Sequence, residues 1–155
     1  MKKQNFSIGA LLQIDLKNGQ YAFGRVVNKE ETLFYDFFTD NISSLGLDKI
    51  YSAKELFRVP VMKYAITSGQ WVLIDNKPIE ADLAIPNKYF MQDVITKEFS
   101  IYHQGNILPA TYEEIKDLEC AAVWEPEHVE DRLRDYFSGA PNVWVEDLKP
   151  KLQVS

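Results

Sequence analysis

The chain has 155 residues, 46% of them apolar, which is enough to bury one core, and we expect a single domain spanning residues 1–155. Its single cysteine, Cys120, excludes an internal disulfide, and no apolar run is long enough for a signal peptide or a membrane span, which favours the cytoplasm. The net charge of −6 is concentrated between Thr111 and Asp147, where eleven acids outnumber three bases (net −8), and this excess disfavours nucleic acid as a partner.

The first predicted element is a β-hairpin over residues 8–27, in which two apolar runs meet at Asn18-Gly19. Asn-Gly accepts positive φ at both central positions of a type I′ turn and is the strongest short-range hairpin signal. A two-residue turn places Leu16 opposite Tyr21, which gives the hairpin one apolar face and one small or polar face. We predict that this hairpin begins a strongly curved antiparallel sheet.

Several strands and one short helix are predicted before residue 110. Thr32–Phe38 is rich in aromatic residues and favours a central strand. Ser52–Glu55 has the spacing of a capping box, which predicts a short helix continuing through Phe57. The remaining predicted strands lie at 61–66, 70–74, 88–92, 98–102 and 107–108, and we expect the last three to close or extend the sheet.

The C-terminal third is predicted to hold two helices. Thr111–Glu114 is a second capping box, and Pro126 begins a helix that ends at Ser138, before the left-handed stop expected at Gly139. A short last strand is expected at 143–145, and loose ends at 1–5 and 148–155. The predicted fold class is therefore α+β, with a predominantly antiparallel, strongly curved or barrel-like sheet and two helices in the C-terminal third.

The helix from Pro126 to Ser138 has one apolar side and one acidic side. Val129, Leu133, Tyr136 and Phe137 form an apolar stripe at helical spacing, which is typical of core packing. Acids follow on the other side, and Arg134 is expected to pair with Glu130 four residues earlier.

Side chains that could perform chemistry are few. His103, His128 and Cys120 lack the spacing of a zinc site, and apolar neighbours should raise the pKa of the Cys120 thiol. There is no glycine-rich phosphate loop and no nucleophile elbow. We therefore expect no metal, no cofactor and no catalysis, although a hydrolase built on clustered carboxylates stays open as an alternative.

Two motifs of the chain stand out. The first is Gly9 followed by an apolar strand and Leu16-x-Asn-Gly-x-Tyr-Ala-Phe-Gly-Arg-Val26; the second runs from Glu114 through Leu118-Glu-x-Ala-Ala-Val-Trp-x-Pro-x-His-Val-Glu-x-Arg-Leu133. Together they resemble the Immunity protein 26 family of bacterial polymorphic toxin systems. The resemblance extends from about Phe6 to Trp144. It implies a cytoplasmic, non-catalytic inhibitor that protects its bacterium from a toxin, often a nuclease.

The hypothesis that follows is stoichiometric binding of a cognate toxin with a basic active-site surface. Acids on the two C-terminal helices would bind the toxin in place of its anionic substrate. The predicted partner-binding residues are Glu113, Glu114, Asp117, Glu127, Glu130, Asp131 and Asp135. Equally, these acids could simply form a solvated surface.

An alternative is a small β-rich binding module for a peptide, a small ligand or single-stranded nucleic acid. Curved sheets rich in aromatic residues can supply stacking platforms for bases. Nucleic acid is the least favoured ligand because the bases that could contact it are scattered: Lys2, Lys3, Arg25, Arg58 and Lys63.

Overall fold

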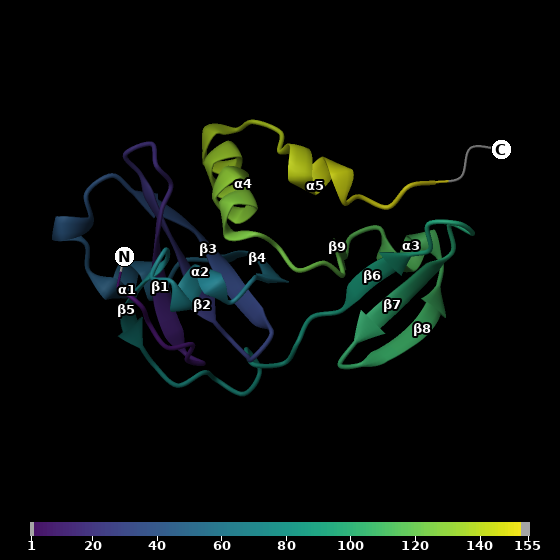
Figure 1. Cartoon of the computed structure of the whole chain (residues 1–155), viewed down its shortest axis with the longest axis horizontal. Helices are drawn as coiled ribbons and strands as arrows, with labels where there is room; N and C mark the ends of the chain where they lie inside the picture. Colours follow the sequence, from purple (N-terminus) through teal and green to yellow (C-terminus); the bar gives the residue numbers. More distant parts are fainter. Residues whose placement is uncertain (1, 153–155) are drawn as a thin grey trace. The chain divides into compact units, whose positions relative to one another are not determined.

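A computed structural model describes residues 2–152 (Figure 1). Its internal contacts divide the chain into two compact units: unit 1 holds residues 2–85 and 123–141, and unit 2 holds residues 86–122 and 142–152. No helix in residues 2–152 is both long and apolar enough to cross a membrane. Of the two ends predicted to be loose, residues 1 and 153–155 lie outside the described residues. Among the described residues of these ends, Gln4 is hydrogen-bonded to Thr67, and Lys151 is hydrogen-bonded to Gln92.

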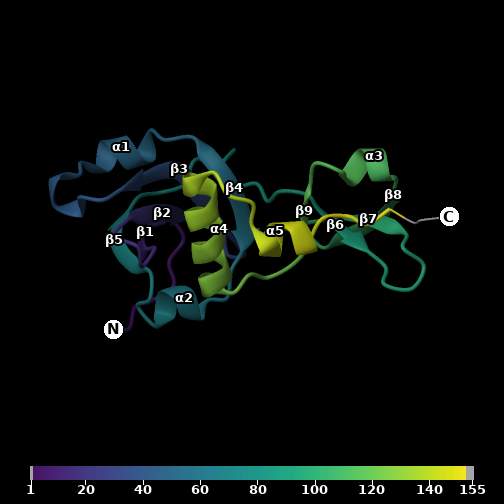
Figure 2. The ribbon, with the colours of Figure 1, turned by 90° about the horizontal axis from the view of Figure 1, so that it is seen from above.

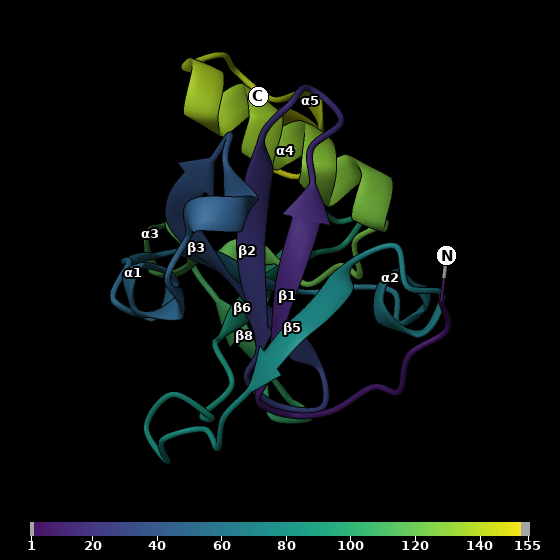
Figure 3. The same cartoon turned by 90° about the vertical axis from the view of Figure 1, so that its left-hand side faces the viewer.

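Unit 1 is built on an antiparallel sheet of five strands, which we call sheet A. Its strand order is β4-β3-β2-β1-β5, and β3, β2, β1 and β5 can be followed side by side in Figure 3. The strands are β1 (Ala10–Asp15), β2 (Tyr21–Val26), β3 (Glu31–Thr39), β4 (Glu55–Pro60) and β5 (Val72–Asn76). The short helices η1 (Ile42–Ser44), α1 (Leu47–Tyr51) and α2 (Tyr64–Thr67) connect them.

Sheet A is buried on both faces. Leu33, on one face of β3, belongs to a core cluster with Leu11 and with Ile50 of α1. Its neighbour Phe34 points to the opposite face, where its ring centroid lies 5.6 Å from that of Trp71. The long helix α4 (Pro126–Ser138) lies against this second face (Figure 2). The prediction of one apolar face and one small or polar face therefore does not describe the burial, because helices cover both sides of the sheet.

The hairpin of β1 and β2 forms, but its register differs by one residue from the prediction. Asp15, not Leu16, is opposite Tyr21. The left-handed residues are Lys17 (φ 61°) and Gly19 (φ 86°), with Asn18 between them, so the loop holds three residues. The Asp15 carboxylate accepts a hydrogen bond from the Lys17 amide at 2.7 Å. Because this bond stabilises the turn, it favours the longer loop.

Two other predictions in unit 1 are wrong. Residues 55–57 belong to strand β4 rather than to a helix, because the Glu55 carboxylate binds Arg58 at 2.8 Å instead of capping Ser52. The strand predicted at 61–66 is largely the one-turn helix α2, whereas the strand predicted at 70–74 matches β5 approximately.

Unit 2 contains a second sheet, which we call sheet C, with the order β8-β7-β6-β9. Its strands are β6 (Tyr89–Gln92), β7 (Phe99–His103), β8 (Asn106–Ala110) and the short β9 (Glu119–Cys120), which runs parallel to β6. Gln104 (φ 51°) and Gly105 (φ 85°) form the two-residue turn between β7 and β8. The predicted strands after residue 86 therefore exist, but they build a sheet of their own.

The helices of the C-terminal third are α3 (Tyr112–Ile115), α4 and α5 (Val143–Asp147). Helix α4 has the predicted bounds, with Gly139 at φ 78°. The strand predicted at 143–145 is helix α5, because the Asn142 side chain caps it by accepting a hydrogen bond from the Val145 amide at 3.0 Å. The α+β class is confirmed, but the count of two helices is not. The barrel-like sheet is also not confirmed. Among the described residues, β4 and β5 are the two outer strands of sheet A and do not pair with each other to close it.

Candidate functional site

The seven acids predicted to bind a partner are divided between the two units. Unit 2 holds Glu113, Glu114 and Asp117, and unit 1 holds Glu127, Glu130, Asp131 and Asp135. The acidic excess is divided as well: unit 1 carries fifteen acids and twelve bases, and unit 2 carries eight acids and five bases, so each has a net charge of −3. The predicted site is therefore two groups of acids, one in each unit.

Glu130 is not a surface acid. It is 2% exposed because it lies beside Val129 and Leu133 on the buried side of α4. Its Oε2 atom accepts hydrogen bonds from Gln70 Nε2 at 2.9 Å and from the Trp71 indole at 3.0 Å, and its Oε1 atom lies 3.0 Å from Lys17 Nζ. The prediction that Glu130 faces a partner is wrong: its carboxylate is occupied in fixing α4 to sheet A.

Arg134 does not pair with Glu130. Its guanidinium contacts the Asp131 carboxylate and donates a hydrogen bond to the carbonyl oxygen of Leu16 at 2.7 Å. Asp131 is therefore engaged on the protein itself, although 41% of its side chain is exposed. Asp135 is half-buried.

Glu127 belongs to a small hydrogen-bonded cluster with Glu125 and Tyr64 at the start of α4. The Tyr64 hydroxyl lies 2.7 Å from a Glu125 oxygen and 3.0 Å from a Glu127 oxygen, and these bonds raise the pKa of Tyr64. Two hydrogen bonds hold the pKa of Glu127 below its usual value. The larger effect comes from its own backbone amide, and a smaller one comes from the Tyr64 hydroxyl. Glu127 is therefore ionised at neutral pH and exposed, which suits contact with a cation.

The acids of α3 are the more exposed group. Thr111 and Glu114 form the predicted capping box, and the hydrogen bond from the Thr111 amide lowers the pKa of Glu114. The side chain of Glu113 is 76% exposed despite its contact with Lys116 at 2.7 Å. Asp117 is also exposed.

Two arginines that were counted above among the bases able to contact nucleic acid are buried. Arg25 and Arg58 are each 5% exposed. Arg25 donates to the carbonyl oxygens of Lys77 and Pro78, and Arg58 binds the Glu55 carboxylate and the Leu83 carbonyl oxygen. Their position inside otherwise apolar strands was the available signal, since a charge in a buried strand requires a partner. Neither arginine is available to a nucleic-acid backbone.

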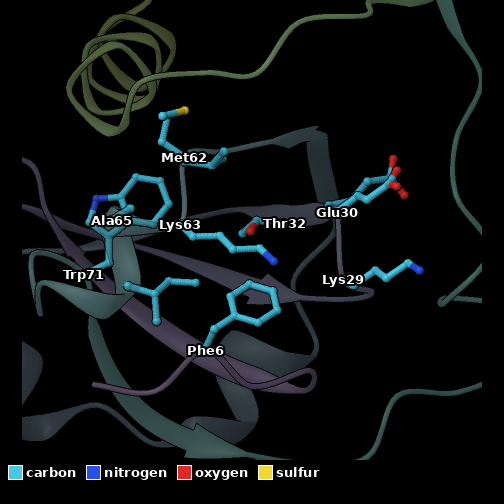
Figure 4. A pocket seen from close by; sticks show the side chains of 11 residues that line it. Phe6, Lys29, Glu30, Thr32, Met62, Lys63, Ala65 and Trp71 are labelled. Carbon is cyan, nitrogen blue, oxygen red and sulfur yellow. The ribbon is translucent and has the colours of Figure 1, made fainter. Parts of the chain in front are cut away.

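A shallow hollow of about 270 Å³, open to solvent, lies beside α2 in unit 1 (Figure 4). Phe6, Ala65 and Trp71 contribute apolar surface, and Lys63 Nζ lies 4.6 Å from the centre of the Phe6 ring. Almost all of this volume is open solvent, and the enclosed part has room for about one water molecule. Pockets that bind small ligands usually measure about 300–1,000 Å³ and bury most of the ligand, so the hollow gives little support to the small-ligand alternative.

The residues considered for chemistry occupy unremarkable positions. His103 Nε2 lies 3.1 Å from the Pro86 carbonyl oxygen. Burial raises the pKa of the half-buried Cys120 thiol, which disfavours the nucleophilic thiolate. No group of three His, Cys, Asp or Glu residues within residues 2–152 could hold a metal ion.

Comparison with known families identifies one. The model of the Immunity protein 26 family matches residues 7–101, which include sheet A and the hairpin motif that begins at Gly9. The motif from Glu114 to Leu133 lies outside this match, so the matched region is shorter than the resemblance had indicated. Comparisons with curated proteins and with solved structures gave no match. Because the matched region covers well over half of the chain, this protein belongs to the Immunity protein 26 family.

Proposed function

We propose that this protein protects a bacterium by binding a cognate toxin stoichiometrically in the cytoplasm. The family match over residues 7–101 carries the proposal, because membership suggests a toxin-neutralising role. The toxin is expected to present a basic active-site surface, such as that of a nuclease. Binding would cover this surface and exclude its substrate.

The proposed mechanism is electrostatic occlusion. Exposed carboxylates attract a basic protein, speed its association and bind in place of its anionic substrate. Glu130 is omitted from this set because it is buried in a network of its own. The proposed contacts are Glu113, Glu114, Asp117, Glu127, Asp131 and Asp135.

The state of the acids supports binding rather than catalysis. A carboxylic acid that protonates a substrate at neutral pH needs a raised pKa. The pKa of Glu114 and that of Glu127 are instead lowered by hydrogen bonds from backbone amides. Both side chains therefore offer fixed negative charge, which suits recognition of a cation.

Co-expression with the toxin encoded by the neighbouring gene tests the proposal. Cells producing both proteins should grow, whereas cells producing the toxin alone should die. Purified wild-type protein should associate with the toxin more slowly as salt is added. Failure of the wild-type protein to protect cells or to bind the toxin would refute the proposed function.

Charge reversal tests the acids. A variant with four acids of α3 and α4 changed to lysine should associate more slowly and with a weaker salt dependence: Glu113, Asp117, Glu127 and Asp135. A matched control carries four reversals at exposed acids elsewhere in unit 1: Asp40, Asp48, Glu80 and Asp82. Both variants change the net charge by +8, so a similar effect in both would remove α3 and α4 from the mechanism.

A further inference from the structure

Residues 77–85, which we call the strap, follow β5 within unit 1 and belong to no helix or strand (Figure 1). Two apolar side chains of the strap, Ile79 and Leu83, are half-buried against the core cluster that includes Leu33 and Ile50. The strap therefore covers part of one face of sheet A without belonging to the sheet.

One row of opposite residues crosses all five strands of sheet A. It consists of Asp75 on β5, Leu11 on β1, Arg25 on β2, Leu33 on β3 and Arg58 on β4. Directly opposite residues point to the same face of a sheet, so both arginines point to the face that the strap covers. Each arginine is only 5% exposed.

Side chains from sheet A and its turns donate hydrogen bonds to carbonyl oxygens at both ends of the strap. The bonds run from Arg25 to Lys77 (3.0 Å) and Pro78 (3.1 Å), from Asn28 to Ala84 (3.2 Å), and from Arg58 to Leu83 (2.9 Å). Because Arg25 lies on β2 and Arg58 on β4, the strap crosses the sheet from β5 towards β4. Its attachment depends on its backbone as well as on its apolar side chains.

The hydrogen bonding of Arg25 under the strap is incomplete. Its Nε atom is buried and has no hydrogen-bond partner within residues 2–152, and the acceptors that it reaches in the strap are uncharged carbonyl oxygens. A buried cation with an unpaired donor keeps part of its desolvation cost. Water would reach this guanidinium once the strap moved away. Opening therefore costs less free energy than the packing of Ile79 and Leu83 alone would suggest.

We propose that the strap opens and closes as one unit while sheet A stays folded. Only four residues, 79–82, separate the carbonyl groups held by Arg25 from the first one held by Arg58, so release of one end removes the support of the other. Opening uncovers Arg25 and the neighbouring core residue Tyr35, which is also 5% exposed when the strap is closed. This inference goes beyond the proposed function and does not depend on it.

Hydrogen exchange at two protons near the start of the strap, followed by NMR, measures its opening. One is the Nε proton of Arg25, and the other is the Lys77 amide, which donates to the Gly9 carbonyl oxygen at 3.2 Å. Arg58→Lys keeps the positive charge but loses the planar donor group that binds Leu83 at the other end. We expect it to speed exchange of both protons by about tenfold or more, since a hydrogen bond from a charged group is lost.

Glu130→Ala is the control, because it removes hydrogen bonds on the opposite face of sheet A, under α4. It should lower the stability of the whole protein to urea and leave exchange of both protons unchanged. Unchanged exchange in Arg58→Lys would mean that the two ends of the strap move independently. If exchange in both variants instead rises in proportion to the overall loss of stability, the strap opens only when the protein unfolds. Either result would overturn the proposal.

The unaltered protein provides a second test that needs no substitution. The Arg25 Nε proton and the Lys77 amide should exchange with the same free energy of opening. The dependence of this free energy on urea should be weaker than that of amides in β2 and β3, because opening of the strap exposes less surface than global unfolding. Two different free energies, or the same urea dependence as the strands, would contradict opening as one unit.

Discussion

Replacing Glu130 with alanine should lower the free energy of unfolding by about 3 kcal/mol. The carboxylate accepts hydrogen bonds from Trp71 and Gln70, and hydrogen bonds to a charged group typically contribute about 1.5–3 kcal/mol each. The Trp71 indole is fully buried and would lose its acceptor. The contact with Lys17 adds little because 59% of the lysine side chain is exposed to water.

Urea unfolding followed by tryptophan fluorescence measures this loss. A change of 3 kcal/mol should lower the unfolding temperature by roughly 6–12 °C in a protein of this size. Glu130→Gln, which keeps the volume and one acceptor oxygen, should lose about 1 kcal/mol. Glu127→Ala, on the same helix but exposed, serves as the control and should lose much less. If Glu130→Ala and Glu127→Ala unfold alike, the buried network does not hold α4 on sheet A.

Four further outcomes are expected. Gly9→Ala should destabilise the protein far more than Gly105→Ala, because both have positive φ but only at Gly9 would a Cβ lie 2.2 Å from the Lys77 carbonyl oxygen; equal unfolding temperatures would contradict this. The lowered pKa of Glu127 means that its stabilising contribution is present above the usual glutamate pKa of about 4.3 and is lost as pH falls through its own, lower pKa; an NMR titration midpoint at or above 4.3 would refute this. The single-domain prediction requires Trp71 of unit 1 and Trp144 of unit 2 to report one shared unfolding transition, and two separate midpoints would count against it. Filter binding with single-stranded DNA and RNA at low salt should show no retention, since Arg25 and Arg58 are buried; clear retention would favour the binding-module alternative.

Local signals predicted the elements that depend on local chemistry. Pro126 and Gly139 fixed both ends of α4, and Thr111 with Glu114 fixed the start of α3. The same kind of signal failed at Ser52, where Glu55 has a stronger partner in Arg58 than in a backbone amide. Capping motifs are reliable only where no tertiary partner competes for the side chain.

The register of the β1–β2 hairpin depends on Asp15 binding the Lys17 amide, a local signal that the Asn18-Gly19 motif obscured. Features that depend on distant residues could not be read in this way. The division into two sheets, for example, depends on which strands pair. Glu130 lies beside Val129 and Leu133 on the buried side of α4, but its hydrogen-bond partner Trp71 is 59 residues earlier in the chain and could not be read from the helix alone. The exposure of Glu113, Glu114, Asp117 and Glu127 was predicted, but the division of the acids between two units was not.

Calorimetric titration of the purified toxin domain, with toxin activity measured at each addition, tests the central claim most directly. Saturation at one protein per toxin, with activity lost in the same proportion, is the expected result. Complete inactivation by a small fraction of an equivalent would instead mean that this chain acts on the toxin catalytically, and the proposal of neutralisation by occupancy would be wrong.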